Sequence, residues 1–150
     1  MSIYEKTFTV RWADMDPNVH MRHSAYTDYA AQVRLDFLAD QGFTMRRFAE
    51  LRIGPILFRE DTRFLKEIGI SETIRVTAEL AGLNADGSRW RILHSIYKAD
   101  GRLAATVTVD GAWLDLQQRK LTVPPAEIAA AFEHISRHET YADIVREKKE

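Results

Sequence analysis

The chain has 150 residues, of which 45% are hydrophobic and 29% are charged. This length corresponds to one domain, and this balance excludes a disordered chain, which would combine low hydrophobicity with high net charge. The 21 basic and 22 acidic side chains leave a net charge of −1, so the basic excess typical of nucleic-acid-binding proteins is missing and we expect no such partner. The chain has no cysteine, which excludes disulfides, thiolate nucleophiles and cysteine-ligated metal sites.

Neither a membrane span nor a secretion signal is indicated by the sequence. No apolar run approaches the roughly 18 residues that a spanning helix needs. The first six residues include Glu5 and Lys6, where a signal peptide would need a hydrophobic stretch. We therefore expect a cytoplasmic protein without a membrane partner.

The first elements expected are a strand, a loop and a long helix. Alternation over residues 4–12 predicts a half-buried strand whose inner face ends at Trp12, and residues 13–23 have the composition of a loop. Apolar residues then recur at helical spacing, which predicts a helix from about 25 to 40 with Ser24 as its N-cap and Gly42 just after its end. Residues 44–51 are expected to form a short additional helical turn.

Strands follow as far as about residue 122, and a short helix follows them. The expected strands are residues 56–66, 73–82, 90–96 and 103–113, and Asp100-Gly101 predicts a type I′ hairpin turn. Trp12, Phe64, Trp90 and Trp113 are expected in the core or at an interface, and Gly111 at a bulge or close backbone approach. Pro124-Pro125 precedes a helix over 126–132, and the charged tail 137–150 is expected to be either a solvated helix or frayed. A single long helix must bury its apolar stripe against the sheet, so the fold class is α+β.

Reactive side chains are densest in the loop before the long helix. Asp14, Asp16, His20 and His23 lie within ten residues of one another, directly before the helix N-terminus. Unpaired N–H groups there can polarise a carbonyl oxygen, and a nearby carboxylate can attack that carbonyl or activate a water. For Asp16 the alternative is a turn-capping role, which Asp-Pro-Asn would serve. The four side chains are also of types that divalent metals accept, but their spacing matches no metal motif, and we predict no metal.

The motif R-W-x-D-x-D-P-N-x-H-x-x-H-x-x-Y, followed by a helix with Val33-Arg34, resembles the hotdog-fold acyl-CoA thioesterases, in particular their 4-hydroxybenzoyl-CoA thioesterase branch. A looser resemblance continues through residues 64–72. It implies a long central helix wrapped by an antiparallel five- or six-stranded sheet, in a single domain over residues 1–136. It further implies hydrolysis of an acyl-CoA thioester, no cofactor beyond the coenzyme A of the substrate, and a homodimer or homotetramer.

The resemblance also assigns roles to particular residues. Asp16 matches the catalytic carboxylate, as nucleophile or general base, and the backbone N–H of His23 matches the donor to the thioester carbonyl. Tyr26 matches the aromatic of the first helical turn, and Asp14 is expected to be structural. The chain departs from the family at Val19, where many relatives have glycine, and at Arg22, where many have asparagine. Ala31 and Gln32 occupy the stretch where some branches carry a glutamate.

Basic residues on the expected strands are candidates for binding the phosphates of coenzyme A. These are Arg59, Arg63, Lys66 and Arg91. Arginine is favoured because its bonds to phosphate are charge-assisted. The alternative is that they form a solvated outer face of the sheet.

Two other classes of function stay open from the sequence. One is a non-hydrolytic acyl-CoA-binding or dehydratase-like hotdog protein, in which His20 would need an acidic partner. The other is a scaffold or interaction module in which the loop is only structural.

Overall fold

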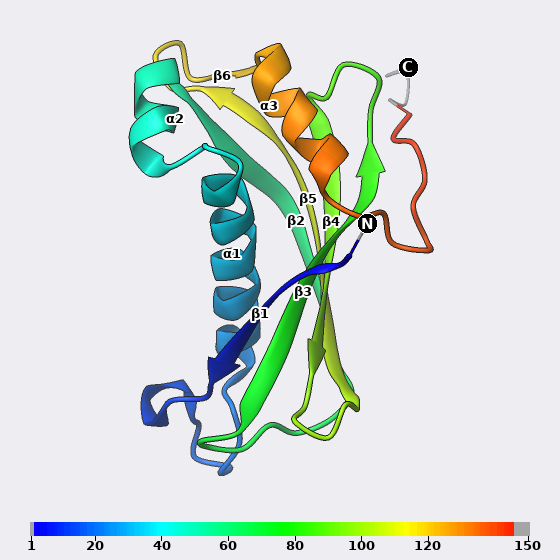
Figure 1. Cartoon of the computed structure of the whole chain (residues 1–150). Coiled ribbons are helices and arrows are strands. Elements are labelled where there is room, and N and C mark those ends of the chain that lie inside the picture. Colours follow the sequence, from blue (N-terminus) through cyan, green and yellow to red (C-terminus); the bar gives the residue numbers. More distant parts are fainter. Residues whose placement is uncertain (1, 146–150) are drawn as a thin grey trace, which may run out of the picture.

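One long helix and an antiparallel sheet dominate the fold (Figure 1). The computed structural model describes residues 2–145. Its strands are β1 (Tyr4–Thr9), β2 (Ile53–Phe64), β3 (Thr73–Leu83), β4 (Arg89–Tyr97), β5 (Leu103–Asp115) and β6 (Lys120–Thr122). Its helices are α1 (His23–Asp40), α2 (Met45–Leu51) and α3 (Ala126–Ala131), with 3-10 turns η1 (Trp12–Asp14) and η2 (Phe132–His134).

Within residues 2–145, the strands form a single six-stranded sheet. Its order is β1-β3-β4-β5-β2, and β6 pairs with the end of β5. Every pairing between these strands is antiparallel, and β3, β4 and β5 form the predicted meander. The long strand β2 pairs with β5 on one side and stands at the end of the sheet, so its other edge is open. The predicted helix wrapped by a five- or six-stranded antiparallel sheet is confirmed.

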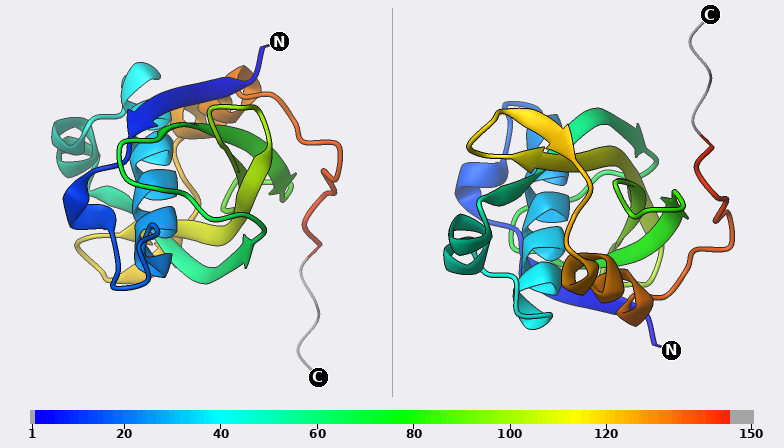
Figure 2. Two further views of the ribbon diagram at one scale, coloured as in Figure 1. Left: turned by 90° about the horizontal axis from the view of Figure 1, so that it is seen from below. Right: turned by 90° about the horizontal axis from the view of Figure 1, so that it is seen from above.

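Helix α1 lies in the concave face of the sheet, which curls around it when viewed along the sheet (Figure 2). Its buried stripe includes Tyr26, Ala30, Val33 and Phe37, as the helical spacing predicted. Phe37 packs edge-to-face on Tyr4 of β1, with ring centroids 5.3 Å apart. The core therefore lies between one face of α1 and the inner face of the sheet.

The beginning of α1 differs from the prediction. The helix starts at His23 with Arg22 as its N-cap residue, because the Arg22 backbone N–H donates to the Asp14 carbonyl (2.7 Å) and fixes where the chain enters the helix. Ser24 is thus not the N-cap, and its hydroxyl accepts from the Arg22 guanidinium (2.6 Å) instead. At the other end, Gly42 has φ of 93°, the left-handed conformation expected of a residue that ends a helix.

Trp12 is not on the inner face of a strand. The strand ends at Thr9, the chain turns into η1, and the Trp12 side chain is 82% exposed. The turn brings Asp14 beneath Arg11, whose backbone and guanidinium N–H groups donate to the Asp14 carboxylate. Alternation thus predicted β1 correctly but extended it too far.

The turn that joins β4 and β5 is not of the predicted type. Gly101 has φ of 88°, but Asp100 does not have the positive φ that a type I′ turn needs at both central residues. The Gly101 backbone N–H donates to Lys98 (2.9 Å), and that of Lys98 donates to Arg102 (2.9 Å). The hairpin is confirmed, with a longer turn that needs only one left-handed residue.

Residues 137–145 are neither a solvated helix nor frayed. They run extended beside the end of β3 that β1 leaves unpaired (Figure 1), where His138 donates to Leu80, Ala142 to Ala81 and Ile144 to Leu83 at 2.8–3.1 Å. Gly82 lies directly under this segment, because a Cβ there would be 3.0 Å from both Ala142 and Ile144. The predicted domain boundary at residue 136 therefore falls inside a segment bound to the sheet, while tail residues 146–150 lie outside the described residues.

Deleting residues 137–150 should destabilise the protein, because it removes the three backbone hydrogen bonds to β3 and exposes that edge. At about 0.5–1.5 kcal/mol for each of the three bonds, the free energy of unfolding should fall by about 1.5–4.5 kcal/mol. Urea denaturation followed by circular dichroism measures the change. An unaltered unfolding midpoint would show that the segment contributes nothing to the fold.

Candidate active site

The loop between β1 and α1 is held in shape by short backbone contacts. Met15 and Met21 form an isolated antiparallel bridge, and the Asp16 backbone N–H donates to His20 (2.9 Å). Val19, at the tip, has φ of 66°, a left-handed conformation that costs a β-branched residue about 1–2 kcal/mol. This explains in physical terms why glycine would suit the position where the sequence has Val19.

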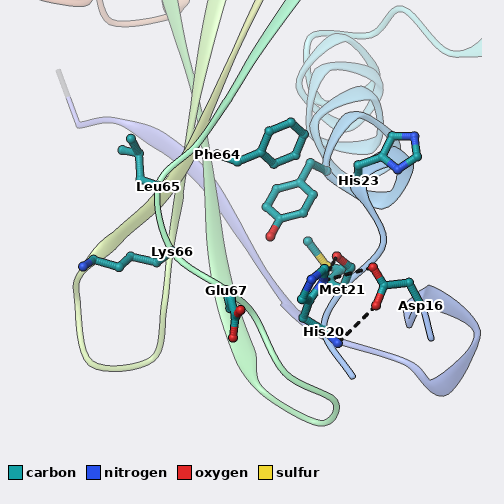
Figure 3. Close-up of a pocket in the computed structure, with 9 residues that line it drawn as sticks. Asp16, His20, Met21, His23, Phe64, Leu65, Lys66 and Glu67 are labelled. Carbon is teal, nitrogen blue, oxygen red and sulfur yellow. Dashed lines mark hydrogen bonds and ion pairs between the residues drawn. The ribbon is translucent and has the colours of Figure 1, made fainter. Parts of the chain in front are cut away.

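The carboxylate of Asp16 is held by the same loop. Its Oδ1 accepts from the backbone N–H of Asn18 (2.9 Å) and, more weakly, of His20 (3.4 Å). Its Oδ2 lies 3.1 Å from Nδ1 of His20 (Figure 3). The side chain remains 20% exposed, so it is fixed in direction but accessible. The turn-capping role considered for Asp16 is therefore real, and it leaves the carboxylate facing the cavity described next.

A cavity of about 360 Å³ opens beside Asp16 (Figure 3). It is lined by Asp16, His20, Met21, His23, Tyr26, Phe64, Leu65, Lys66 and Glu67. Tyr26 and Phe64 pack edge-to-face with centroids 4.9 Å apart and join the helix start to the end of β2. The cavity thus has an apolar wall opposite a carboxylate.

The first turn of α1 supplies a hydrogen-bond donor at this cavity. His23 is the first helical residue, and its backbone N–H has no acceptor among residues 2–145. The N-terminal N–H groups of a helix carry partial positive charge and favour a developing negative charge. Burial, followed by the nearby carboxylate of Asp16, raises the pKa of the Tyr26 phenol, which therefore stays protonated at neutral pH.

Asp14, although adjacent in the motif, is occupied elsewhere. Its carboxylate is 1% exposed and accepts from Arg11 and from the Tyr29 hydroxyl. Burial alone would raise its pKa, but the hydrogen bonds from Arg11 and Tyr29 hold the pKa at about 2. Asp14 is absent from the cavity lining, which agrees with the structural role expected for it.

The candidate phosphate-binding residues separate into two places. Arg59, Arg63 and Arg91 gather around a hollow of about 380 Å³ on the convex face of the sheet, together with Asp61 and Asp110. Arg91 pairs with Asp110 at 2.5 Å, whereas Arg59 and Arg63 share Asp61 at 3.4 and 3.6 Å. Lys66 instead lies at the rim of the cavity, with its side chain pointing away from Asp16 (Figure 3).

Three residues that line the cavity, Met21, Leu65 and Glu67, were not among the sequence predictions. Phe64, expected in the core or at an interface, lies at the cavity with 54% exposure and is therefore not a core residue. His94 was not singled out and Arg34 was named only as part of the motif, but the two meet at 3.0 Å between α1 and the sheet. A charged residue on the apolar stripe of a helix, and a histidine on the inner face of a strand, were the signals available.

Neither a metal site nor a membrane-spanning helix is found in the part of the chain that the structure describes. No group of three or more His, Cys, Asp or Glu side chains there could hold a metal ion. None of the helices in residues 2–145 is both long and apolar enough to cross a membrane.

Solved structures of known proteins share this fold. A hypothetical protein from Staphylococcus aureus, solved in complex with CoA, superposes with a TM-score of 0.83 at 21% identity, over 98% of this chain and 90% of that one. A DHNA-CoA thioesterase from Staphylococcus aureus gives 0.80 at 18% identity over 89% and 91%. A 1,4-dihydroxy-2-naphthoyl-CoA thioesterase from Synechocystis gives 0.78 at 14% identity over 87% and 96%.

The sequence comparisons place the chain in a family. No curated protein matches the sequence. Residues 10–132 match the family described as the thioesterase-like superfamily, a range that includes the loop, α1 and every strand except β1. The predicted hotdog fold is confirmed by these similarities. The chain belongs to the thioesterase-like superfamily, as the motif around Asp16 and His23 predicted.

Proposed function

We propose that the protein is an acyl-CoA thioesterase, which hydrolyses an acyl-CoA to a free acid and coenzyme A. One observation carries this proposal. The Asp16 carboxylate lies on the wall of a cavity that is also lined by His23, the first residue of α1, whose backbone N–H has no acceptor among residues 2–145. Structures of similar fold include proteins described as DHNA-CoA and gentisyl-coenzyme A thioesterases, which supports a coenzyme A thioester as the substrate class.

The chemistry follows from the two groups at the cavity. The thioester carbonyl oxygen accepts from the His23 backbone N–H, which stabilises the negative charge that develops on that oxygen. Asp16 either attacks the carbonyl carbon, giving an anhydride that water then cleaves, or takes a proton from a water that attacks directly. In both routes the carbon–sulfur bond breaks, the thiolate of coenzyme A leaves and takes up a proton, and the acyl group ends as a carboxylic acid. The residues need no cofactor for this reaction.

Release of free thiol tests the proposal directly. The purified protein is incubated with a panel of aromatic, short-chain and long-chain acyl-CoAs, and the thiol is titrated with a chromogenic disulfide. We expect turnover of at least one acyl class well above the rate without protein. Binding of acyl-CoA without thiol release would instead support a non-hydrolytic binding protein, and neither binding nor release would support a scaffold.

A dehydratase-like activity is the second candidate, because His20 has an acidic partner in Asp16 at 3.1 Å. A histidine paired with a carboxylate can move a proton to and from a carbon next to a carbonyl. Hydration of an enoyl-CoA, followed by loss of its ultraviolet absorbance, separates this reaction from thiol release. We favour hydrolysis because Asp16, and not only His20, lies at the cavity wall.

We also propose that the arginines of the convex face bind the phosphates of coenzyme A. Arg59, Arg63 and Arg91 outnumber the two carboxylates in their hollow, so an anion would be attracted there. This face of the sheet is opposite to the one that packs against α1. A homodimer or homotetramer, in which one subunit's arginines serve another subunit's cavity, would reconcile the two locations, and the open edge of β2 offers a surface for pairing.

Replacing both Arg59 and Arg63 by glutamine should raise KM for acyl-CoA about tenfold or more, because each charge-assisted bond to phosphate contributes roughly 1.5–3 kcal/mol. The kcat/KM for the corresponding acyl-pantetheine, which lacks the nucleotide phosphates, should not change. Arg102→Gln, a change at an exposed arginine of the β4–β5 turn, is the matched control. Equal losses with both substrates would contradict phosphate binding at this face.

A further inference from the structure

Arg34 is a half-buried cation on the face of α1 that packs against the sheet, and the charge of Glu60 compensates only part of the effect of its burial. It lies on α1, partly buried, and no carboxylate among residues 2–145 is within ion-pair distance of its guanidinium. Burial lowers its pKa to about 10, so the group is still charged at neutral pH. Its one hydrogen bond in this part of the chain goes to Nε2 of His94, at 3.0 Å. Most of the donors of the guanidinium therefore remain available.

The tautomer of His94 is set by its surroundings. Nδ1 lies 2.8 Å from the carbonyl oxygen of Thr77, which can only accept, so Nδ1 carries the proton. Nε2 then has a lone pair and accepts from Arg34. Burial, followed by the charge of Arg34, lowers the pKa of His94 to about 3, so the imidazole is neutral at physiological pH. His94 thus orients the guanidinium without neutralising it.

A pocket of about 200 Å³ lies beside Arg34, between α1 and the inner face of the sheet. Its walls are hydrocarbon and aromatic, and the lining residues with polar side chains are Arg34, Trp90 and Trp113, whose side chains carry donors and no acceptor. Trp113 donates to the Gly87 carbonyl (3.2 Å), but the buried N–H of Trp90 has no partner among residues 2–145. A pocket with free donors and no acceptor fits an acceptor-only group, and a carboxylate matches the planar fork of arginine best.

We propose that Arg34 determines substrate specificity by binding a carboxylate at the far end of the acyl group, so that the preferred substrates are dicarboxylic acids carried as coenzyme A half-thioesters. This inference rests on the proposed thioesterase function. Hydroxyl-bearing acyl groups are less suitable, because a hydroxyl would bring a donor that finds no acceptor among the side chains of the pocket lining.

The distance between the two ends of such a substrate agrees with the fold. Tyr26 lines the catalytic cavity and Arg34 lies on the same helix eight residues later, about 12 Å along the axis. Helical side chains lean toward the N-terminus, so the guanidinium lies closer to the cavity than this. A diacid of medium length spans this separation.

The first test needs no catalysis. The chain has three tryptophans, of which Trp90 and Trp113 line the pocket and Trp12 is exposed. In a Trp12→Phe background, indole fluorescence therefore reports on the pocket. Titrations of this emission should give a dissociation constant for octanoate at least tenfold lower than that for octanol, and Arg34→Met should remove this difference. Arg34→Gln, which keeps a donor for His94, covers the case in which the methionine variant does not fold. Arg46→Met, at an exposed arginine of α2, is the matched control and should bind octanoate like the parent.

The second test compares turnover of diacid and monoacid substrates of equal length. The wild-type protein should hydrolyse adipoyl-CoA or suberoyl-CoA with kcat/KM at least tenfold above hexanoyl-CoA or octanoyl-CoA, and Arg34→Gln should reverse the order. Hydrolysis without this preference overturns the inference and leaves the thioesterase function standing. Arg34-dependent octanoate binding without hydrolysis of any acyl-CoA keeps the carboxylate site and rejects the thioesterase function. Octanoate and octanol binding equally well rejects the carboxylate site.

Discussion

Asp16→Asn should lower kcat for thioester hydrolysis by about 10²–10⁴-fold, the range by which a positioned general base contributes. An amide can neither attack a carbonyl nor take a proton from water at neutral pH. The fold should persist, because asparagine keeps the Oδ1 that accepts from the Asn18 backbone N–H. Steady-state thiol release with the best acyl-CoA of the panel, together with the thermal unfolding midpoint, measures both effects.

Asp28→Asn is the matched control for this variant. Asp28 lies in the first turns of α1, and its side chain is 68% exposed and pairs with Arg22 outside the cavity. The change removes the same charge near the same helix end, so a general electrostatic effect on substrate attraction would appear in both variants. If turnover survives in Asp16→Asn, or falls equally in Asp28→Asn, Asp16 has no catalytic role in the reaction.

Asp14→Asn should lower the free energy of unfolding by about 2–4 kcal/mol. The change should leave the reacting groups at the cavity in place, because Asp14 is not part of its lining. The buried carboxylate accepts from Arg11 and from the Tyr29 hydroxyl, and asparagine replaces one acceptor oxygen by an NH₂ group that faces donors. Urea denaturation at pH 7 measures the loss. An Asp14→Asn protein as stable as the wild type would show that these bonds do not hold the loop.

The same carboxylate makes stability depend on pH. The pKa of Asp14 is about 2 in the folded protein and 3.8 ordinarily, so its contribution is complete above about pH 5 and is lost as the pH falls toward 2. This shift corresponds to about 2 kcal/mol. Between pH 5 and pH 2, the wild type should therefore lose about 2 kcal/mol more stability than Asp14→Asn, and parallel stability curves for the two proteins would contradict the assignment.

Local patterns predicted most of the elements, and the deviations come from contacts between distant residues. The alternation in β1 continues to Trp12 in the sequence, but Val10 makes the last hydrogen bonds to the segment before β3, and the bonds between Arg11 and Asp14 then turn the chain into η1. Ser24 is a favourable N-cap by type, yet the bond from Arg22 to Asp14 determines where α1 begins. The attachment of residues 137–145 to β3 depends on how much of β3 is left unpaired by β1, which no local pattern contains.

The candidate site was predictable to a similar degree. The motif singled out Asp16, His23 and Tyr26, and all three line one cavity. The clustering of Arg59, Arg63 and Arg91 needed strand order and register, including the bulge between Leu57 and Arg59. The meeting of Arg34 with His94 needed the packing of α1 on the sheet, because a charged residue on one apolar face and a histidine on another do not by themselves show that the two are neighbours.

The attachment of residues 137–145 has a consequence for biosynthesis. During translation, β3 leaves the ribosome long before its last partner, so residues 80–83 present an open strand edge until residues 137–145 have been made. Open edges are templates for pairing with other chains, and nascent chains on one polysome are crowded together. Synthesis interrupted before residue 137 would thus yield products that have every catalytic candidate but lack the segment that protects their sheet, and such products should aggregate more readily than a chain that includes residues 137–145.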